Sequence, residues 1–111
     1  MKWVRITDVR NIPAREGRAV QISSTSIAVF NLDGRFVALE NRCPHKGGPL
    51  ADGIVGAGTV TCPLHNWRVS LESGRVTKPC DGEDLSVRTF DVRVENGVLM
   101  LSLEAMETAA A

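Results

Sequence analysis

Two short segments near the middle of the chain decide its fold: Cys43-Pro44-His45-Lys46-Gly47-Gly48-Pro49-Leu50 and Cys62-Pro63-Leu64-His65-Asn66-Trp67. Each segment contains one cysteine and one histidine, and the chain has no other histidine. Thiolate and imidazole side chains on two facing turns would offer four ligands to metal. The sequence therefore predicts a metal centre that joins two Cys/His pairs, 43–45 and 62–65, separated by the sixteen residues 46–61.

The prolines and glycines in these segments indicate tight turns. Pro44 and Pro63 follow the two cysteines, and a proline ring fixes φ at about −65° and removes an amide donor. Gly47 and Gly48 lack a Cβ, so the backbone at these positions can turn sharply and approach a metal-bound sulfur closely. We expect both segments to be stiff loops.

Other interpretations of the four residues stay open at this point. Two cysteines and two histidines can hold zinc, although zinc modules usually pair like with like as C-x2–4-C and H-x3–5-H, whereas each pair here is mixed. The residues could also be unrelated buried side chains, but both histidines stand beside a cysteine and a proline. Cys80 has no histidine nearby, and we interpret it as a free cysteine.

The two segments resemble the cluster-binding loops of Rieske [2Fe-2S] proteins, and the resemblance covers nearly the whole chain. In that family two cysteines bind one iron and two histidines bind the other. The resemblance implies that Cys43, His45, Cys62 and His65 hold a Rieske-type [2Fe-2S] cluster and that the protein transfers single electrons. It also implies an all-β fold, an antiparallel β-sandwich or barrel with an inserted cluster-binding subdomain at about residues 41–80.

The turn signals along the chain agree with an all-β class. Asn96-Gly97 between two β-rich runs predicts a hairpin, and Asp33-Gly34 predicts another. The apolar set Val87, Phe90, Val92 and Val94 keeps period two from Phe90 onward, which places Arg93 and Glu95 on the solvated face. Strands are predicted over residues 3–6, 19–22, 26–31, 35–39, 59–62, 67–71, 87–95 and 98–103, with a helical turn over residues 8–13.

Length and composition indicate one domain, residues 1–111, with a fraying tail at 104–111. The formal net charge is zero and the basic residues are scattered, which argues against nucleic-acid binding. No stretch approaches the roughly 18 apolar residues of a membrane span, and charges in the first eight residues argue against a signal peptide. With two of the three cysteines assigned to metal, no intrachain disulfide is expected, and we predict a reducing, cytoplasmic setting.

Departures from one branch of the Rieske family narrow the type of centre. High-potential members carry a loop-linking disulfide at the positions of Gly48 and Leu64, and hydroxyl donors to sulfur at the positions of Trp67 and Val69. Neither a cysteine nor a hydroxyl stands at these positions here. The resemblance therefore implies a reduction potential in the lower part of the Rieske range.

The chain is expected to depend on a partner for substrate chemistry. A terminal oxygenase would need an iron site with two further histidines, which this chain lacks. Residues 43–50, 53–55, 62–67 and 87–97 together resemble the small subunit of assimilatory NAD(P)H-dependent nitrite reductases, which serve nitrate assimilation. That resemblance implies a partner in a large flavin- and sirohaem-bearing reductase subunit.

Two alternatives to this assignment remain. The main one is the Rieske ferredoxin of a ring-hydroxylating dioxygenase system, although residues 46–49 (Lys-Gly-Gly-Pro) and 66–67 (Asn-Trp) favour the nitrite reductase subunit. The other is a regulatory or structural subunit whose cluster only cross-links the loops. A redox partner is expected to dock either at Lys46 and Trp67, beside the ligands, or at an acidic patch formed by Asp81, Glu83 and Asp84. For Trp67 the simpler interpretation is a side chain packed beneath the cluster.

Overall fold

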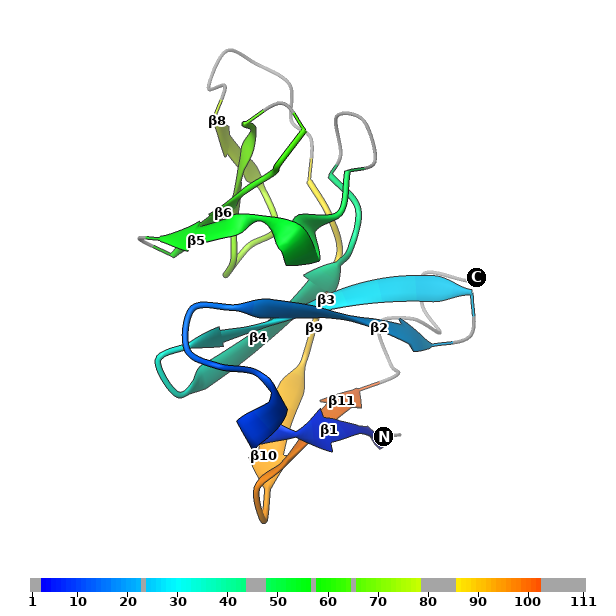
Figure 1. The fold of residues 1–111 in the computed structure, drawn as a ribbon. Helices are drawn as coiled ribbons and strands as arrows, with labels where there is room; N and C mark the ends of the chain where they lie inside the picture. The colour runs from blue at the N-terminus through cyan, green and yellow to red at the C-terminus, as the bar shows by residue number, and fades with distance from the viewer. Residues whose placement is uncertain are drawn as a thin grey trace.

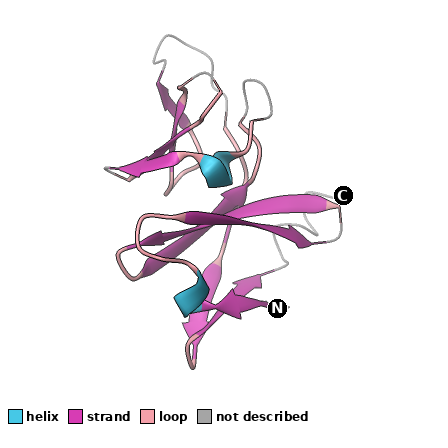
Figure 2. Ribbon diagram, viewed as in Figure 1, coloured by secondary structure: helices cyan, strands magenta, loops and turns pink. Residues whose placement is uncertain are grey.

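The computed structural model describes residues 3–22, 24–43, 48–56, 58–64, 66–78 and 86–102. Within these ranges the chain forms eleven strands and two 3₁₀ turns, and every strand pair is antiparallel (Figure 2). The predicted all-β class is confirmed. The elements are β1 (Trp3–Asp8), η1 (Val9–Asn11), β2 (Gly17–Ile22), β3 (Thr25–Leu32), β4 (Arg35–Glu40), η2 (Leu50–Asp52), β5 (Ile54–Gly56), β6 (Thr59–Thr61), β7 (Arg68–Ser70), β8 (Val76–Lys78), β9 (Thr89–Phe90), β10 (Val92–Glu95) and β11 (Val98–Ser102).

The strands form three sheets arranged along the long axis of the molecule. A base sheet has the order β1-β11-β10, a central sheet β2-β3-β4-β9, and a distal sheet β5-β6-β7-β8. Figure 1 shows the central sheet lying between the base sheet below and the distal sheet above. Both candidate ligand segments adjoin the distal sheet, because Cys43 follows β4 on the way to that sheet and Cys62 follows β6.

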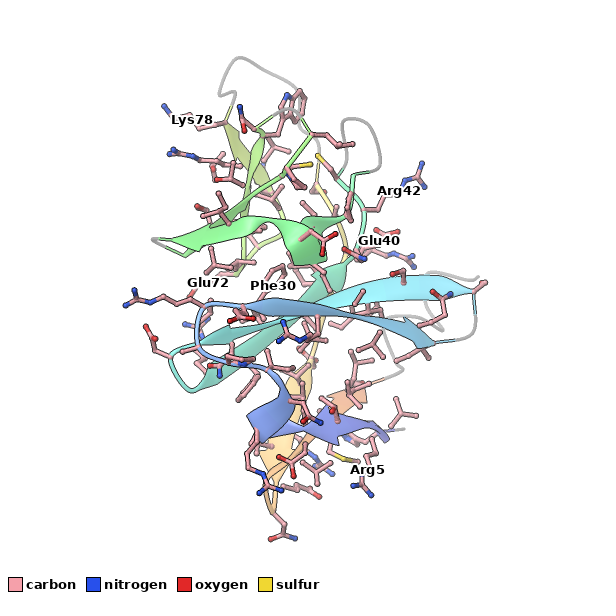
Figure 3. The ribbon with its side chains drawn as sticks, in the orientation of Figure 1. Arg5, Phe30, Glu40, Arg42, Glu72 and Lys78 are labelled. Carbon is pink, nitrogen blue, oxygen red and sulfur yellow. The ribbon has the colours of Figure 1, made fainter. Side chains whose placement is uncertain are left out.

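Strand β3 is buried on both faces because sheets lie on both sides of it. Residues 27–30, Ile-Ala-Val-Phe, have no solvent exposure. Successive side chains of a strand point to opposite faces, so Phe30 packs into a core shared with the distal sheet and Val29 into a core shared with the base sheet. In Figure 3 Phe30 lies between the central and distal sheets. The distal core consists of Ala28, Phe30, Leu39, Cys43, Leu50, Ala51, Val60, Cys62, Val69, Leu71 and Val87, and the base core of Ile12, Ile27, Val29, Ala38, Phe90, Leu99 and Leu101.

The two hairpins predicted from turn residues are confirmed. Asp33 and Gly34 join β3 to β4 with φ values of 56° and 104°. Asn96 and Gly97 join β10 to β11 with φ values of 52° and 77°. Two consecutive positive φ values are what a two-residue turn needs to follow the right-handed twist of its strands, and asparagine, aspartate and glycine tolerate them best.

The run predicted as a single strand over residues 87–95 divides between two sheets. Thr89–Phe90 pair with β4 in the central sheet, whereas Val92–Glu95 pair with β11 in the base sheet. The break falls at Asp91, whose carbonyl accepts a hydrogen bond from the Ser102 amide at 2.9 Å. Of the predicted apolar set, Val87 and Phe90 are buried and Val92 packs on the base core. The prediction is wrong for Val94, which lies on β10, the outer strand of a three-stranded sheet, and is 46% exposed.

The remaining predicted elements match in part. The helical turn over residues 8–13 is present as η1, and the strands β5 and β8 were not predicted. The predicted tail at 104–111 lies outside the described residues, and the subdomain boundaries at 41 and 80 stay a prediction. In the described ranges no helix has the length and apolar character needed to cross a membrane.

Candidate metal centre

The structure brings together the two segments that carry the predicted ligands. Cys43 and Cys62 are 2% and 1% exposed, both are unbridged thiols, and both belong to the distal core. A Cβ built on Gly48 would lie 2.8 Å from the Cys62 Sγ, so the first segment passes directly over the cysteine of the second. The predicted ligands His45 and His65, together with Lys46 and Cys80, lie outside the described residues.

Each loop is closed by hydrogen bonds of its own backbone. The Cys43 amide donates to the Gly48 carbonyl at 2.8 Å, and the Cys62 amide donates to the Trp67 carbonyl at 2.7 Å. In the second loop the Asn66 amide donates to the Cys62 carbonyl at 3.1 Å, and Asn66 itself has φ of 59°. Asparagine visits this left-handed region more readily than most residues. Both cysteines are therefore held at fixed points of closed loops.

The two loops pack so closely that position 48 has room only for glycine. The Cβ position of Gly48 lies 2.9 Å from Leu64 Cδ1 as well as against the Cys62 sulfur. The positions at which high-potential Rieske proteins carry their disulfide thus face each other here, but neither holds a cysteine. Any additional side-chain atom at position 48 would press on a candidate ligand.

The surroundings of the thiols fit an iron–sulfur cluster. Thiolates are the protein ligands that soft metal centres and iron–sulfur clusters select. The two described thiols are removed from solvent and packed among apolar side chains, including Leu50 and Val60. The residues present therefore fit the thiolate half of such a centre. Among the described residues no group of three or more metal-binding side chains gathers, and both histidines fall outside this set.

Trp67 and Val69 stand where high-potential Rieske proteins carry hydroxyl donors. Trp67 is half-buried and packs against the distal core, in agreement with its interpretation as a packed residue. Val69 has no solvent exposure. Leu64, by contrast, is 55% exposed on the second loop. Apolar packing thus surrounds the cysteines on the inside, and one aliphatic side chain is presented to solvent beside them.

A polar cluster lies where the first loop leaves the central sheet. The Arg88 guanidinium contacts the Glu40 carboxylate at 3.2 Å, and the Arg88 amide donates to the same carboxylate at 3.4 Å. Burial would raise the pKa of Glu40, but the hydrogen bonds from Arg88 outweigh it and the pKa is lowered. Figure 3 shows Glu40 and Arg42 on the side of the molecule where this loop begins. Glu40 therefore remains a carboxylate at neutral pH.

Asn41 is a residue of this region that the sequence patterns did not indicate. Its side-chain amide accepts a hydrogen bond from the Ala51 amide at 2.8 Å and donates one to Ser26 Oγ at 3.1 Å. The only sequence signal is an asparagine between a strand and the first cysteine. Ser26 lies opposite Asn41 in the register of the β3–β4 hairpin, whereas Ala51 follows the first loop and no local pattern could reveal it as a partner.

Comparison with known proteins places the chain among electron carriers. Residues 2–91 match the family model of the Rieske [2Fe-2S] domain. The ferredoxin component of the naphthalene 1,2-dioxygenase/salicylate 5-hydroxylase systems of Ralstonia sp is 26% identical over 102 residues, or 92% of this chain and 96% of that protein. The 3-phenylpropionate/cinnamic acid dioxygenase ferredoxin subunit of Escherichia coli O139:H28 is 34% identical over 105 residues, or 93% and 95%.

A nitrite reductase is also among the relatives. The NAD(P)H nitrite reductase large subunit of Klebsiella oxytoca is 35% identical over 100 residues, which cover 86% of this chain but only 10% of that subunit. The match is therefore to a small part of a much larger protein.

Solved structures share the fold. The ferredoxin of carbazole 1,9a-dioxygenase from Nocardioides aromaticivorans IC177 superposes with a TM-score of 0.83 at 25% identity, covering 92% of this chain and 98% of that one. A protein provisionally named the small subunit of an NADPH nitrite reductase gives a TM-score of 0.79 at 24% identity, covering 92% and 99%. Since the family model spans most of the sequence and the buried thiols fit the cofactor, the chain belongs to the Rieske [2Fe-2S] family of electron-transfer proteins.

Proposed function

We propose that this Rieske protein is the small subunit of an assimilatory NAD(P)H-dependent nitrite reductase, the enzyme that reduces nitrite to ammonia. The observation that carries the proposal is the 35% identity with a 100-residue part of the Klebsiella oxytoca large subunit. The Lys-Gly-Gly-Pro and Asn-Trp sequences at 46–49 and 66–67 support it. In this proposal the chain works in the cytoplasm beside a large flavin- and sirohaem-bearing subunit, which performs the substrate chemistry.

The proposed ligand set is that of the sequence analysis. Cys43 and Cys62 would bind one iron, and His45 and His65 the other. When bound, a cluster of this kind accepts and returns one electron at a time. The described residues support this role physically: the closed loops fix both sulfurs, the distal core keeps water from them, and Gly48 lets the first segment approach the Cys62 sulfur closely.

A second candidate function is the ferredoxin of a ring-hydroxylating dioxygenase system. It is favoured by the two dioxygenase ferredoxins described above, which match this chain over nearly the full length of both proteins. Such ferredoxins pair with oxygenases or reductases. The two candidates share fold, cofactor and carrier role, and they differ in the partner that receives the electron.

The partner can be identified by reconstitution with purified enzymes from the same organism. The reduced protein is mixed either with a nitrite reductase large subunit or with a ring-hydroxylating oxygenase, and oxidation of the cluster is followed by its visible absorbance. We expect NAD(P)H-dependent nitrite reduction by the large subunit to require this chain and to be lost with the Cys62→Ser variant. Oxidation by the oxygenase alone would support the ferredoxin function instead.

The ligand assignment is tested by metal analysis of two cysteine variants. The wild type should contain about two irons and two sulfides per chain. Cys62→Ser should lose both because a cluster thiolate is removed, whereas Cys80→Ser, the matched control, should keep the full visible spectrum. One zinc per chain without visible absorbance would contradict the assignment, and loss of the cluster in Cys80→Ser would show that the wrong thiol was chosen.

A further inference from the structure

Asn41 stands at the base of the first loop, between the end of β4 and Cys43. Its backbone amide donates to the Ser26 carbonyl at 2.9 Å, and its side-chain Nδ2 donates to Ser26 Oγ at 3.1 Å. Its Oδ1 accepts from the Ala51 amide at 2.8 Å. The residue thus joins strand β3, the start of the loop and the turn η2 that follows the loop. Three hydrogen bonds from one partly buried residue fix both ends of the loop against the central sheet.

The turn η2 connects Asn41 to the second loop through packed side chains. Leu50 and Ala51 of η2 are buried in the distal core. Gly53, which follows η2, packs so tightly on β6 that a Cβ there would meet Val60 Cγ2 at 2.6 Å and the Thr61 carbonyl. Strand β6 leads directly into Cys62. A continuous series of contacts therefore runs from Asn41 through η2 to the strand that carries the second cysteine.

We propose that Asn41 is a positioning residue for the cluster, whose side-chain amide ties Asn41 to Ala51 and to Ser26 and so sets where Cys43 lies relative to Cys62. This inference rests on the proposed ligand set. The described hydrogen bonds of the Asn41 side chain go to Ser26 Oγ and to the Ala51 amide. It acts through Ala51, and its removal should loosen the loop without removing a ligand.

Asn31, in strand β3, provides a matched control. Its side-chain Nδ2 donates to the Ile12 carbonyl at 2.8 Å, and its Oδ1 accepts from the Gly34 amide at 2.7 Å. Like Asn41 it joins two chain segments through both atoms of a side-chain amide. Its partners, however, lie in the 12–34 region and not in either cysteine loop. Replacing it removes the same kind of bonds and should affect stability alone.

The test compares the holoproteins of the wild type, Asn41→Ala, Asn41→Asp and Asn31→Ala. Cluster release into an iron chelator is followed by visible absorbance, and exchange of the Ala51 amide is followed by mass spectrometry or NMR. Asn41→Ala should release the cluster about tenfold faster, which corresponds to about 1.4 kcal/mol, should expose the Ala51 amide to exchange and should broaden the EPR signal of the reduced cluster. Asn41→Asp should restore slow release, because its carboxylate can accept from both the Ala51 amide and the Ser26 hydroxyl.

Asn31→Ala should lower the thermal midpoint but release the cluster at the wild-type rate. If Asn31→Ala accelerates release as much as Asn41→Ala, Asn41 acts through overall stability and the inference is overturned. Wild-type release from Asn41→Ala would overturn it as well. Failure of the proposed ligand set shows earlier and separately, as a wild-type protein without iron and sulfide, and failure of the proposed partner shows in the reconstitution assay.

Discussion

At the residue scale, the absence of a side chain at Gly48 allows the two cysteine loops to pack against each other. We predict that Gly48→Ala lowers the iron and sulfide content of the purified protein, because its Cβ would lie within 2.8 Å of the Cys62 sulfur. Overpacking of this kind typically costs about 1–3 kcal/mol. Gly56→Ala is the control, since a Cβ at that position meets nothing within 4 Å. Equal iron content in the two variants would show that the loops are less closely packed than described.

Asp8 gives a pH dependence at the residue scale. It caps η1, and its hydrogen bond with the Arg10 side chain, followed by that with the Arg10 amide, lowers the pKa of Asp8 from 3.8 to about 2. A lowered carboxyl pKa means that the charged form favours the folded state. Its contribution is therefore complete above about pH 4 and is lost as the pH falls toward 2.

We expect Asp8→Asn to be less stable than the wild type at pH 5, and the difference in thermal midpoint to shrink between pH 4 and pH 2. In an Arg10→Gln background the same substitution should have a smaller effect, because the main cause of the lowered pKa is gone. A difference that is constant from pH 5 to 2 would contradict the assignment of the effect to ionised Asp8.

At the scale of the element, strand β3 separates the two cores. Phe30 and Ile27 are both fully buried, but Phe30 faces the distal core and Ile27 the base core. Phe30→Ala should destabilise the protein by about 3–5 kcal/mol and Ile27→Ala by about 2–5 kcal/mol. Native-state hydrogen exchange should rise mainly in β6 and β7 for Phe30→Ala, and mainly in β11 for Ile27→Ala. The same exchange pattern in both variants would show that the two cores behave as one.

The elements that could be predicted from sequence are those whose signal is local. Asn96-Gly97 and Asp33-Gly34 predicted their hairpins because the turn residues themselves must adopt positive φ. The alternation of apolar and polar residues could not reveal that the run 87–95 changes sheets at Asp91, because a strand shows the same two-residue period whichever sheet it joins. Strands β5 and β8 have three residues each, and they exist because β6 and β7 offer neighbouring edges, which is information from elsewhere in the chain.

The same distinction holds for the candidate site. Cysteine and histidine spacing predicted which segments meet, and the structure places Gly48 of the first segment against Cys62 of the second. Asn41 lies opposite Ser26 at the end of the β3–β4 hairpin, but the sequence gives no sign that its side chain also accepts from Ala51, which comes near only when η2 packs on the central sheet. Chemistry-bearing residue types are visible in a sequence, whereas residues that position them depend on tertiary contacts.

At the scale of the whole molecule, the division into two cores predicts that iron removal destabilises the distal sheet more than the base sheet. Both described cysteines belong to the distal core, and the base core contains no candidate ligand. Chelation of iron should therefore release amide protection in β5 to β8 while protection in β1, β10 and β11 persists, since a metal centre cross-links the segments that bind it. A single cooperative loss of protection over all three sheets would contradict this division.

The reduction potential is a further property of the assembled protein. Trp67 packs on the distal core and Val69 is fully buried, and neither side chain has a hydroxyl group to replace the donors found in high-potential Rieske proteins. Fewer hydrogen bonds to sulfur leave the reduced cluster less stabilised, and we expect a midpoint of roughly −150 to −50 mV at neutral pH. A redox titration monitored by EPR measures it. A midpoint above about +150 mV would show that other contacts set the potential.

The turn at Asn96-Gly97 lies at the opposite end of the molecule from the distal sheet (Figure 1). Its glycine has open space around it, and exposed turn tips tolerate insertions well. A short tether inserted between these two residues would fasten the protein to a solid support by its base. Every immobilised copy would then present its cysteine-bearing end outward in one common orientation, ready for collision with a partner in solution.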